Sequence, residues 1–354
     1  MAELNQPKKS AFAGKMLGIL NGSMLAMMIS IGRQTGLLES LAALPPSTSA
    51  GIAEATGLNE RYVREWLGAM ATGGIVEYDP DTDTYFFPPE HAALLTNAGG
   101  ARNMARFIQY MPMLAEVEED VVACFRNGGG VPYSRYPRFQ KLMSESSRLR
   151  FDQLLLDRMI PLTGSSGMLD RGIRVLDIGC GHGHATNLLA QAYPHSRFVG
   201  YDFSAEGIAE AQAEARAMGN ANAHFAVQDV STFNESGQYD LITAFDVIHD
   251  QAQPAAVLRA IADALTKEGV FLMVDVRAAS DLKGNLAHPL GPFVYGFSTM
   301  HCMTVSLALD GEGLGTAWGE QKACAMLREA GFRQVQVSRL EEDPMNNYYL
   351  ARKR

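Results

Sequence analysis

The chain has 354 residues, a formal net charge of −9, and a composition that is 47% hydrophobic and 19% charged. This composition excludes a disordered or collagen-like protein, and the net acidity disfavours a large surface for nucleic acid or anionic membrane. Cys124, Cys180, Cys302 and Cys324 show neither zinc spacing nor the density of a disulfide scaffold. The most apolar run, Met24–Ile31, is shorter than a bilayer requires, so we expect a soluble, cytoplasmic protein without a metal site.

The first part of the chain is predicted to be mainly helical as far as about Phe125, because apolar residues recur every three or four positions. The segment Phe12–Ile31 is rich in Leu, Met and Ile, with few charges to mark a solvated face. A helix that is apolar around most of its circumference has to be buried. We therefore expect a homodimer formed through the N-terminal helices.

Residues 47–87 have the layout of a winged helix-turn-helix. Two helices are expected, at Ser47–Thr56 and from the cap Asn59 to about Thr72, followed by a hairpin over Ile75–Phe87. This motif either binds DNA or serves as a structural, dimer-forming module. Acidic side chains outnumber basic ones in residues 1–100, and neighbouring glutamates offset Arg61 and Arg64 of the second helix. The charge balance favours the structural role.

The second part of the chain alternates short β-branched runs with helical runs, which predicts a parallel sheet with crossover helices. A helix over Arg138–Ile160 is expected to stop at Pro161, and Thr163–Gly167 is expected to link two domains, 1–165 and 166–354. The strands are expected at Arg174–Ile178, Arg197–Tyr201, His224–Val227, Leu241–Phe245, Val270–Asp275 and Gln334–Ser338.

The segment VLDIGCGHGHATN, residues 175–187, is the most specific signal in the sequence. A hydrophobic strand leads into Asp177 and then into alternate glycines from Gly179 to Gly183, where glycine lets a ligand lie close to the backbone. The third glycine of a dinucleotide fingerprint would fall at His184, and no Lys-Ser/Thr pair follows as in a P-loop.

An acidic residue two positions before G-x-G-x-G resembles motif I of class I S-adenosylmethionine (SAM)-dependent methyltransferases, and the family's other motifs follow in order over residues 165–354. The resemblance implies SAM as cofactor and an α/β fold: a Rossmann-like, seven-stranded methyltransferase domain preceded by a mainly helical winged-helix domain. The carboxylate of Asp202 would bind the ribose, Phe203 would pack on the adenine, and Asp229 and Val230 would read its edge. The implied cofactor-binding residues are Asp177, Gly179, Cys180, Gly181, Asp202, Phe203, Asp229, Val230 and Phe245.

The segment VIHDQAQP, residues 247–254, is similar to the His-Asp segment of plant and bacterial small-molecule O-methyltransferases, which also carry an N-terminal winged-helix dimerisation domain. This resemblance implies that His249 is a general base and Asp250 its neighbour. Gln251 stands where the family has Trp, and a second acidic partner is not identified downstream. Alternatively, His249 only packs or hydrogen-bonds beside the cofactor.

The acceptor site is expected between the helix that follows Tyr133, which resembles the family's helix across the active site, and Asp281–Gln321. The latter is a long insertion, which we interpret as a lid. Its histidines and cysteine do not have zinc spacing. The expected acceptor contacts are Tyr133, Tyr136, Phe139, Met143, Met159, Tyr295 and His301.

The sequence therefore predicts methyl transfer from SAM to a small organic acceptor. A hydroxyl is expected first because of His249, a thiol second because it needs less help from a base, and an amine third. The alternative is a SAM-responsive transcription regulator in which the cofactor fold is only a sensor.

Overall fold

The computed structural model of the protein describes residues 4–354. Two units divide between Ala115 and Glu116, so the predicted boundary near residue 165 lies inside the second unit. The reason is that Phe151, Leu155 and Ile160 are buried in the core of the large sheet. Residues 163–167, predicted as a linker, form a tight turn in which the side chains of Thr163 and Ser165 are buried.

The first unit contains the predicted winged helix-turn-helix. Thr48 and Asn59 cap the motif's two helices with their side chains, and Gly57, at φ +67°, ends the first of them. A two-stranded antiparallel hairpin follows as the wing. The elements are α1 (Gln6–Gln34), α2 (Leu37–Ala43), α3 (Ser49–Thr56), α4 (Glu60–Thr72), β1 (Glu77–Asp79), β2 (Thr84–Phe86), α5 (Pro89–Leu95), η1 (Asn97–Arg102), α6 (Met104–Ile108) and α7 (Tyr110–Ala115).

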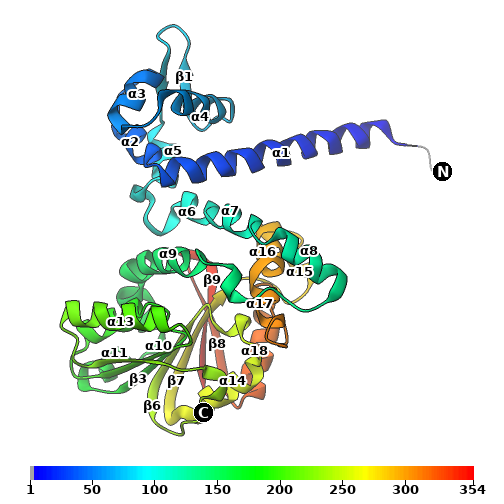
Figure 1. Ribbon diagram of the computed structural model, residues 1–354. Coiled ribbons are helices and arrows are strands. Elements are labelled where there is room, and N and C mark those ends of the chain that lie inside the picture. The colour runs from blue at the N-terminus through cyan, green and yellow to red at the C-terminus, as the bar shows by residue number, and fades with distance from the viewer. Residues whose placement is uncertain (1–3) are drawn as a thin grey trace. The chain divides into compact units, whose positions relative to one another are not determined.

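The long helix α1 is buried only toward its C-terminal end. There, Trp66 of α4 donates its indole N–H to the carbonyl oxygen of Met28 at 2.8 Å, and Ile29 enters the core of the unit. Figure 1 shows the preceding turns of α1 extending beyond the rest of the first unit. Their side chains are exposed, with Phe12 at 61% and Leu17 at 62%. By length and composition α1 could cross a bilayer, a test that the buried core helix of a soluble protein or an N-terminal signal sequence also passes.

The second unit is built on a seven-stranded sheet in the order β5-β4-β3-β6-β7-β9-β8, parallel except for β9, which runs antiparallel to both its neighbours. This confirms the predicted fold class. The strands are β3 (Arg174–Ile178), β4 (Arg197–Asp202), β5 (Ala223–Val227), β6 (Tyr239–Phe245), β7 (Leu265–Val276), β8 (Gln334–Leu340) and β9 (Asp343–Arg352).

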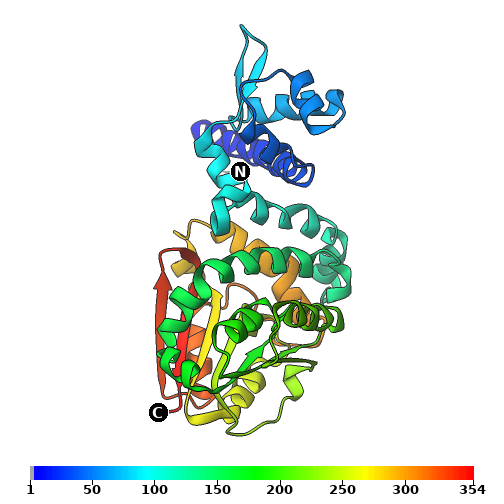
Figure 2. The ribbon, with the colours of Figure 1, turned by 90° about the vertical axis from the view of Figure 1, so that its left-hand side faces the viewer.

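Helices cover both faces of this sheet (Figure 1 and Figure 2). Leu189 of α12 and Ile208 of α13 belong to the core on one face, and Leu258 of α14 and Leu327 of α18 belong to the core on the other. The helices and turns are α8 (Glu118–Asn127), η2 (Tyr133–Arg135), α9 (Phe139–Leu154), η3 (Leu155–Met159), α10 (Ile160–Thr163), α11 (Ser166–Arg171), α12 (His184–Ala192), α13 (Ala205–Met218), η4 (Val230–Thr232), η5 (Ile248–Asp250), α14 (Pro254–Ala264), α15 (Leu282–Asn285), α16 (Gly291–Phe297), η6 (Ser298–Cys302), α17 (Met303–Leu307) and α18 (Gly319–Glu329).

The helical run that begins at Phe139 continues past the proline at which it was predicted to stop. A π-helical turn, η3, joins α9 to α10, and Pro161 lies in the first turn of α10. Proline is tolerated in a first turn, where its missing N–H would have no helical partner. The predicted stop at Pro161 is therefore wrong, and the run ends at Gly164, at φ +70°.

Candidate active site

The glycine loop lies between β3 and α12, at the point where the order of the parallel strands reverses direction. Ligands of open α/β sheets bind at such a switch point, beside the carboxyl ends of the strands. Gly179 and Gly183 have positive φ, and a Cβ added there would overlap Val247 and Ala211 respectively. A Cβ at Gly181 would meet no atom within 4 Å, so this part of the loop leaves room for a ligand.

Two aspartates fix the shape of the loop. The carboxylate of Asp177 accepts hydrogen bonds from the hydroxyls of Thr186 and Thr243, both at 2.8 Å. Burial raises the pKa of Asp177 to about 6, although both hydrogen bonds oppose the shift. Asp202 accepts backbone N–H bonds from Gly181 at 2.9 Å and Ser204 at 2.8 Å. Each carboxylate oxygen of Asp202 retains a lone pair, so a further donor can bind there.

A cavity opens over this loop, and all nine residues predicted to bind the cofactor line it. The fit to an adenosyl sulfonium rests on three of its features. Gly181 leaves space beside the backbone, Asp202 offers a buried carboxylate to a hydroxylated sugar, and Phe203 exposes 54% of its residue surface for packing. The cavity lining is Tyr133, Phe139, Gln140, Met143, Ser144, Ser147, Arg148, Phe151, Asp177, Gly179, Cys180, Gly181, His182, His184, Ala185, Asp202, Phe203, Gln228, Asp229, Val230, Phe245, Asp246, Val247, Asp250 and Gln251.

His249 lies in the short turn after β6, between two carboxylates. Its Nδ1 is 2.8 Å from Oδ1 of Asp275, at the end of the neighbouring strand β7, and its Nε2 is 3.3 Å from Oδ1 of Asp250. Burial alone would lower the pKa of His249, but the Asp275 and Asp250 carboxylates outweigh it and raise the pKa well above its usual range. The structure therefore holds the imidazole in one orientation, as an active-site base requires.

Asp250 is held in place from the other side by Tyr133, whose hydroxyl donates to Oδ2 of Asp250 at 2.9 Å. The ring of Tyr133 is also 5.3 Å from the ring of Phe203 at the cofactor cavity. Tyr133 thus contacts both Phe203, which was predicted to pack on the cofactor, and Asp250, which was predicted to lie beside the general base.

The residues predicted to contact the acceptor divide into three groups. Tyr133, Phe139 and Met143 line the cavity. His301 lies one layer deeper, stacked on Phe139 with ring centroids 3.7 Å apart, and Tyr136 packs edge-on against His301. Burial and the nearby charge of His249 lower the pKa of His301 to about 3, so its ring is neutral.

Two more of the predicted contacts lie away from the cavity. Met159 belongs to the hydrophobic core beneath the sheet, because the π-helical turn that contains it faces inward. Tyr295 accepts a hydrogen bond at its hydroxyl from the side chain of Asn285 at 3.0 Å and does not line the cavity. The position of a tyrosine or methionine in a helical segment of the sequence does not reveal whether its side chain faces a cavity.

The sequence did not identify Asp275 or Cys302 as part of the site. Asp275 supplies the second carboxylate that was not found downstream of Asp250. Its position at the carboxyl end of a predicted strand beside β6 was the signal, because such ends converge on one edge. Cys302 lies in the π-helical turn η6 of the predicted lid, fully buried near His249 and Asp250. No sequence pattern marked it.

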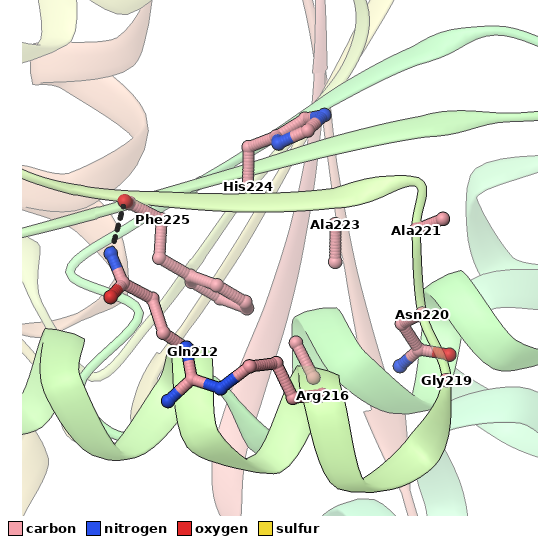
Figure 3. Close-up of a pocket in the computed structure, with 9 residues that line it drawn as sticks. Gln212, Arg216, Gly219, Asn220, Ala221, Ala223, His224 and Phe225 are labelled. Carbon is pink, nitrogen blue, oxygen red and sulfur yellow. Dashed lines mark hydrogen bonds between the residues drawn. The ribbon is translucent and has the colours of Figure 1, made fainter.

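A second hollow lies between α13 and the edge strand β5 (Figure 3). Its lining includes Arg216, His224 and Gln212, whose amide nitrogen donates to the carbonyl oxygen of Phe225 at 3.1 Å. None of the predicted site residues lines it.

Comparison with known protein families gives one match for each predicted module. The profile described as Rv2258c-like winged HTH domain matches residues 23–97, and the one described as methyltransferase domain matches residues 169–330. Among curated proteins, the chain is 27% identical over 146 residues to malonyl-[acyl-carrier protein] O-methyltransferase of Bacillus cereus, covering 41% of this chain and 49% of that protein. It is 39% identical over 72 residues to trans-aconitate 2-methyltransferase of Streptomyces avermitilis, covering 20% and 27% respectively. The chain thus spans half or less of the length of these two relatives.

Solved structures match over nearly the whole chain. An O-methyltransferase family protein from Burkholderia thailandensis has a TM-score of 0.70 at 14% identity, covering 96% of this chain and 98% of that one. Human N-acetylserotonin methyltransferase, solved with SAM, has a TM-score of 0.66 at 16% identity, covering 99% of each chain. At such low identity these likenesses show the shared fold. Together with the matched modules, they show that the chain joins an N-terminal winged helix-turn-helix domain to a methyltransferase domain of this fold.

Proposed function

We propose that the protein transfers the methyl group of SAM to a hydroxyl of a small organic acceptor, with His249 as the general base. The observation that carries this proposal is the Asp275–His249–Asp250 cluster beside the cavity that fits the cofactor. A hydroxyl is a weak nucleophile until its proton is removed, and an oriented imidazole is suited to remove it.

When bound, the sulfonium supplies an activated methyl group, so the protein's task is alignment and proton removal. Asp275 accepts the N–H of Nδ1, so Nε2 is the nitrogen that takes the acceptor proton once it has released its own proton to solvent. Tyr133 holds Asp250 beside Nε2, where its carboxylate stabilises the imidazolium that forms. The aromatic rings of Tyr133 and Phe139 exclude water from this end of the cavity.

A panel of hydroxyl, thiol and amine acceptors, scored by formation of S-adenosylhomocysteine, tests the proposal. We expect activity with a hydroxyl acceptor, and we expect His249→Gln to lower its rate by roughly 10²–10⁴-fold without a comparable change in SAM affinity. The matched control is His195→Gln, at an exposed histidine outside the cavity, which should leave the rate unchanged.

Near-full methyl transfer by His249→Gln would remove His249 from proton transfer. Activity confined to thiols or amines would instead reassign the acceptor.

We also infer that two copies of the chain associate through α1. Its exposed apolar residues Phe12, Met16, Leu20 and Met24 follow one another every four positions, which forms a stripe along one side of the helix. A second copy offers the same stripe, so one contact covers both. In the described residues all four cysteines are unpaired, which supports the expected cytoplasmic location.

The winged helix does not favour the transcription-regulator alternative. In α4, the helix in the recognition position, Arg61 pairs with Glu65, and Arg64 lies 3.4 Å from Glu60. These pairs offset the positive charge that phosphate binding requires.

A further inference from the structure

Three side chains with different donor atoms converge between the turn that follows β6 and the π-helical turn η6 inside the predicted lid. One imidazole nitrogen of His249, one carboxylate oxygen of Asp250 and the sulfur of Cys302 all lie within 4.8 Å of one another. His249 and Cys302 are buried, and Asp250 borders the cavity. The three therefore share a small, enclosed space with one open side.

At least one proton lies among the atoms that meet there, because the carboxylates of Asp275 and Asp250 raise the pKa of His249 well above its usual range. Oδ1 of Asp250 is buried and has no hydrogen-bond partner in the described residues, whereas Oδ2 accepts from Tyr133. Nε2 of His249 faces this oxygen at 3.3 Å, and Nδ1 is already engaged by Asp275. Such a convergence is stable only when a proton or a cation lies between the donor atoms.

The spacing suits a cation with short bonds to nitrogen, oxygen and sulfur. Around tetrahedral Zn²⁺, neighbouring N and O ligands lie roughly 3.4 Å apart, as follows from bond lengths of about 2.0–2.2 Å. The 3.3 Å between Nε2 and Oδ1 is close to this separation. The Asp275–His249 hydrogen bond also has the carboxylate–histidine arrangement that orients a metal-binding imidazole.

We propose that His249, Asp250 and Cys302 form a site for Zn²⁺ or another thiophilic divalent cation, and that its occupancy inhibits methyl transfer. The cation bonds to Nε2, Oδ1 and Sγ; the proton on Sγ and any proton on Nε2 pass to solvent. The fourth coordination position faces the cavity and is filled by water. Inhibition follows because the metal occupies the lone pair that the proposed base needs, so this consequence rests on the proposed function.

Metal binding is measured on the full chain without acceptor, so its outcome does not depend on catalysis. We expect calorimetry to give one Zn²⁺ per chain, and Co²⁺ to give a thiolate-to-metal charge-transfer absorption. Cys302→Ala should weaken Zn²⁺ binding at least about tenfold and abolish this absorption. Cys324→Ala, at a half-buried cysteine of α18, is the matched control and should bind as the wild type does.

Cys302→Ser keeps the volume of the side chain and guards against a packing defect, and unaltered SAM affinity shows that each variant is folded. Equal Zn²⁺ affinity in the Cys302 and Cys324 variants, or no thiolate absorption with Co²⁺, would overturn the site. If His249→Gln loses activity in metal-free buffer while Zn²⁺ binding leaves methyl transfer of the wild type unchanged, ligation by Nε2 is overturned. The activity of His249→Gln is measured in metal-free buffer. A failure of the proposed general base is therefore distinguished from a failure of the proposed metal site.

Discussion

At Gly183, as at Gly179, space and backbone conformation both demand glycine. Gly183 has φ +73°, and a Cβ there would lie 2.4 Å from Cβ of Ala211 and 2.7 Å from the ring of Phe225. Gly219, which ends α13, has nearly the same φ of +74° but open space around it. The two positions therefore separate crowding from backbone strain.

We expect Gly183→Ala to lower the free energy of unfolding by about 1–3 kcal/mol more than Gly219→Ala does, because only the former overpacks the core. Denaturant unfolding of the two variants measures the difference. Calorimetric SAM affinity should fall in Gly183→Ala alone, since the loop must shift to admit the methyl group. Equal losses of unfolding free energy in both variants would mean that the core beside Gly183 accommodates the added methyl group without further destabilisation.

At the residue scale, the residues on the cofactor side of the site could be predicted from the sequence more completely than those on the acceptor side. Asp177 and Asp202 lie at strand ends adjoining a glycine loop, and local spacing alone brings them to one cavity. The partner of His249 on Nδ1 is Asp275, which is distant in sequence and arrives only through the pairing of β6 with β7. Cys302 depends on how an irregular insertion folds, which no periodicity encodes.

Among the helices, α9 is tied to the cofactor domain by charged contacts. His184 of α12 has Nε2 at 2.7 Å from Asp152 of α9 and Nδ1 at 2.8 Å from Glu214 of α13, and Arg148 of α9 lies 3.0 Å from Glu214. Two carboxylates can both accept only from the doubly protonated ring. Burial lowers the pKa of His184, but the bonds to Glu214 and Asp152 outweigh it, and the pKa is raised.

The contacts of His184 with Asp152 and Glu214 predict that the stability of the protein depends on pH. Because the pKa of His184 is raised in the folded state, its protonation stabilises the fold. This contribution is fully present below the unfolded pKa of about 6.5 and is lost as pH rises through the folded pKa. The free energy of unfolding of the wild type should therefore fall, relative to His184→Gln, which lacks the titrating group, as pH rises from about 6.5 through the raised folded pKa. Denaturant unfolding across that range measures it. Parallel curves for the two proteins would exclude a stabilising role for the imidazolium.

The elements were predicted well where their ends carry capping signals, and less well where a helix is irregular. Gly57 and Asn59 mark helix ends that the structure reproduces, and the helix predicted from Ser47 begins at Ser49, after its cap Thr48. The π-helical turns η3 and η6 insert an extra residue into a helical run, and tertiary packing decides where this happens.

At the scale of the whole molecule, the exposed stripe on α1 predicts the oligomeric state. We expect a dimer at micromolar concentration by light scattering, and a monomer for the double variant Leu20→Glu, Met24→Glu, since burying these charges would oppose association. The control is Lys15→Glu, which changes a charged position off the stripe and should remain dimeric. A monomeric wild type would rule out association through this helix.

Tyr133 has a consequence for how the two ends of the cavity depend on each other. Its ring contacts Phe203, and its hydroxyl holds Asp250, so one side chain connects the two ends of the cavity. A ligand that displaces the Phe203 ring also disturbs the group that holds the carboxylate beside His249. Occupancy of one end of the cavity is therefore coupled to the position of the carboxylate at the other end through a single phenol.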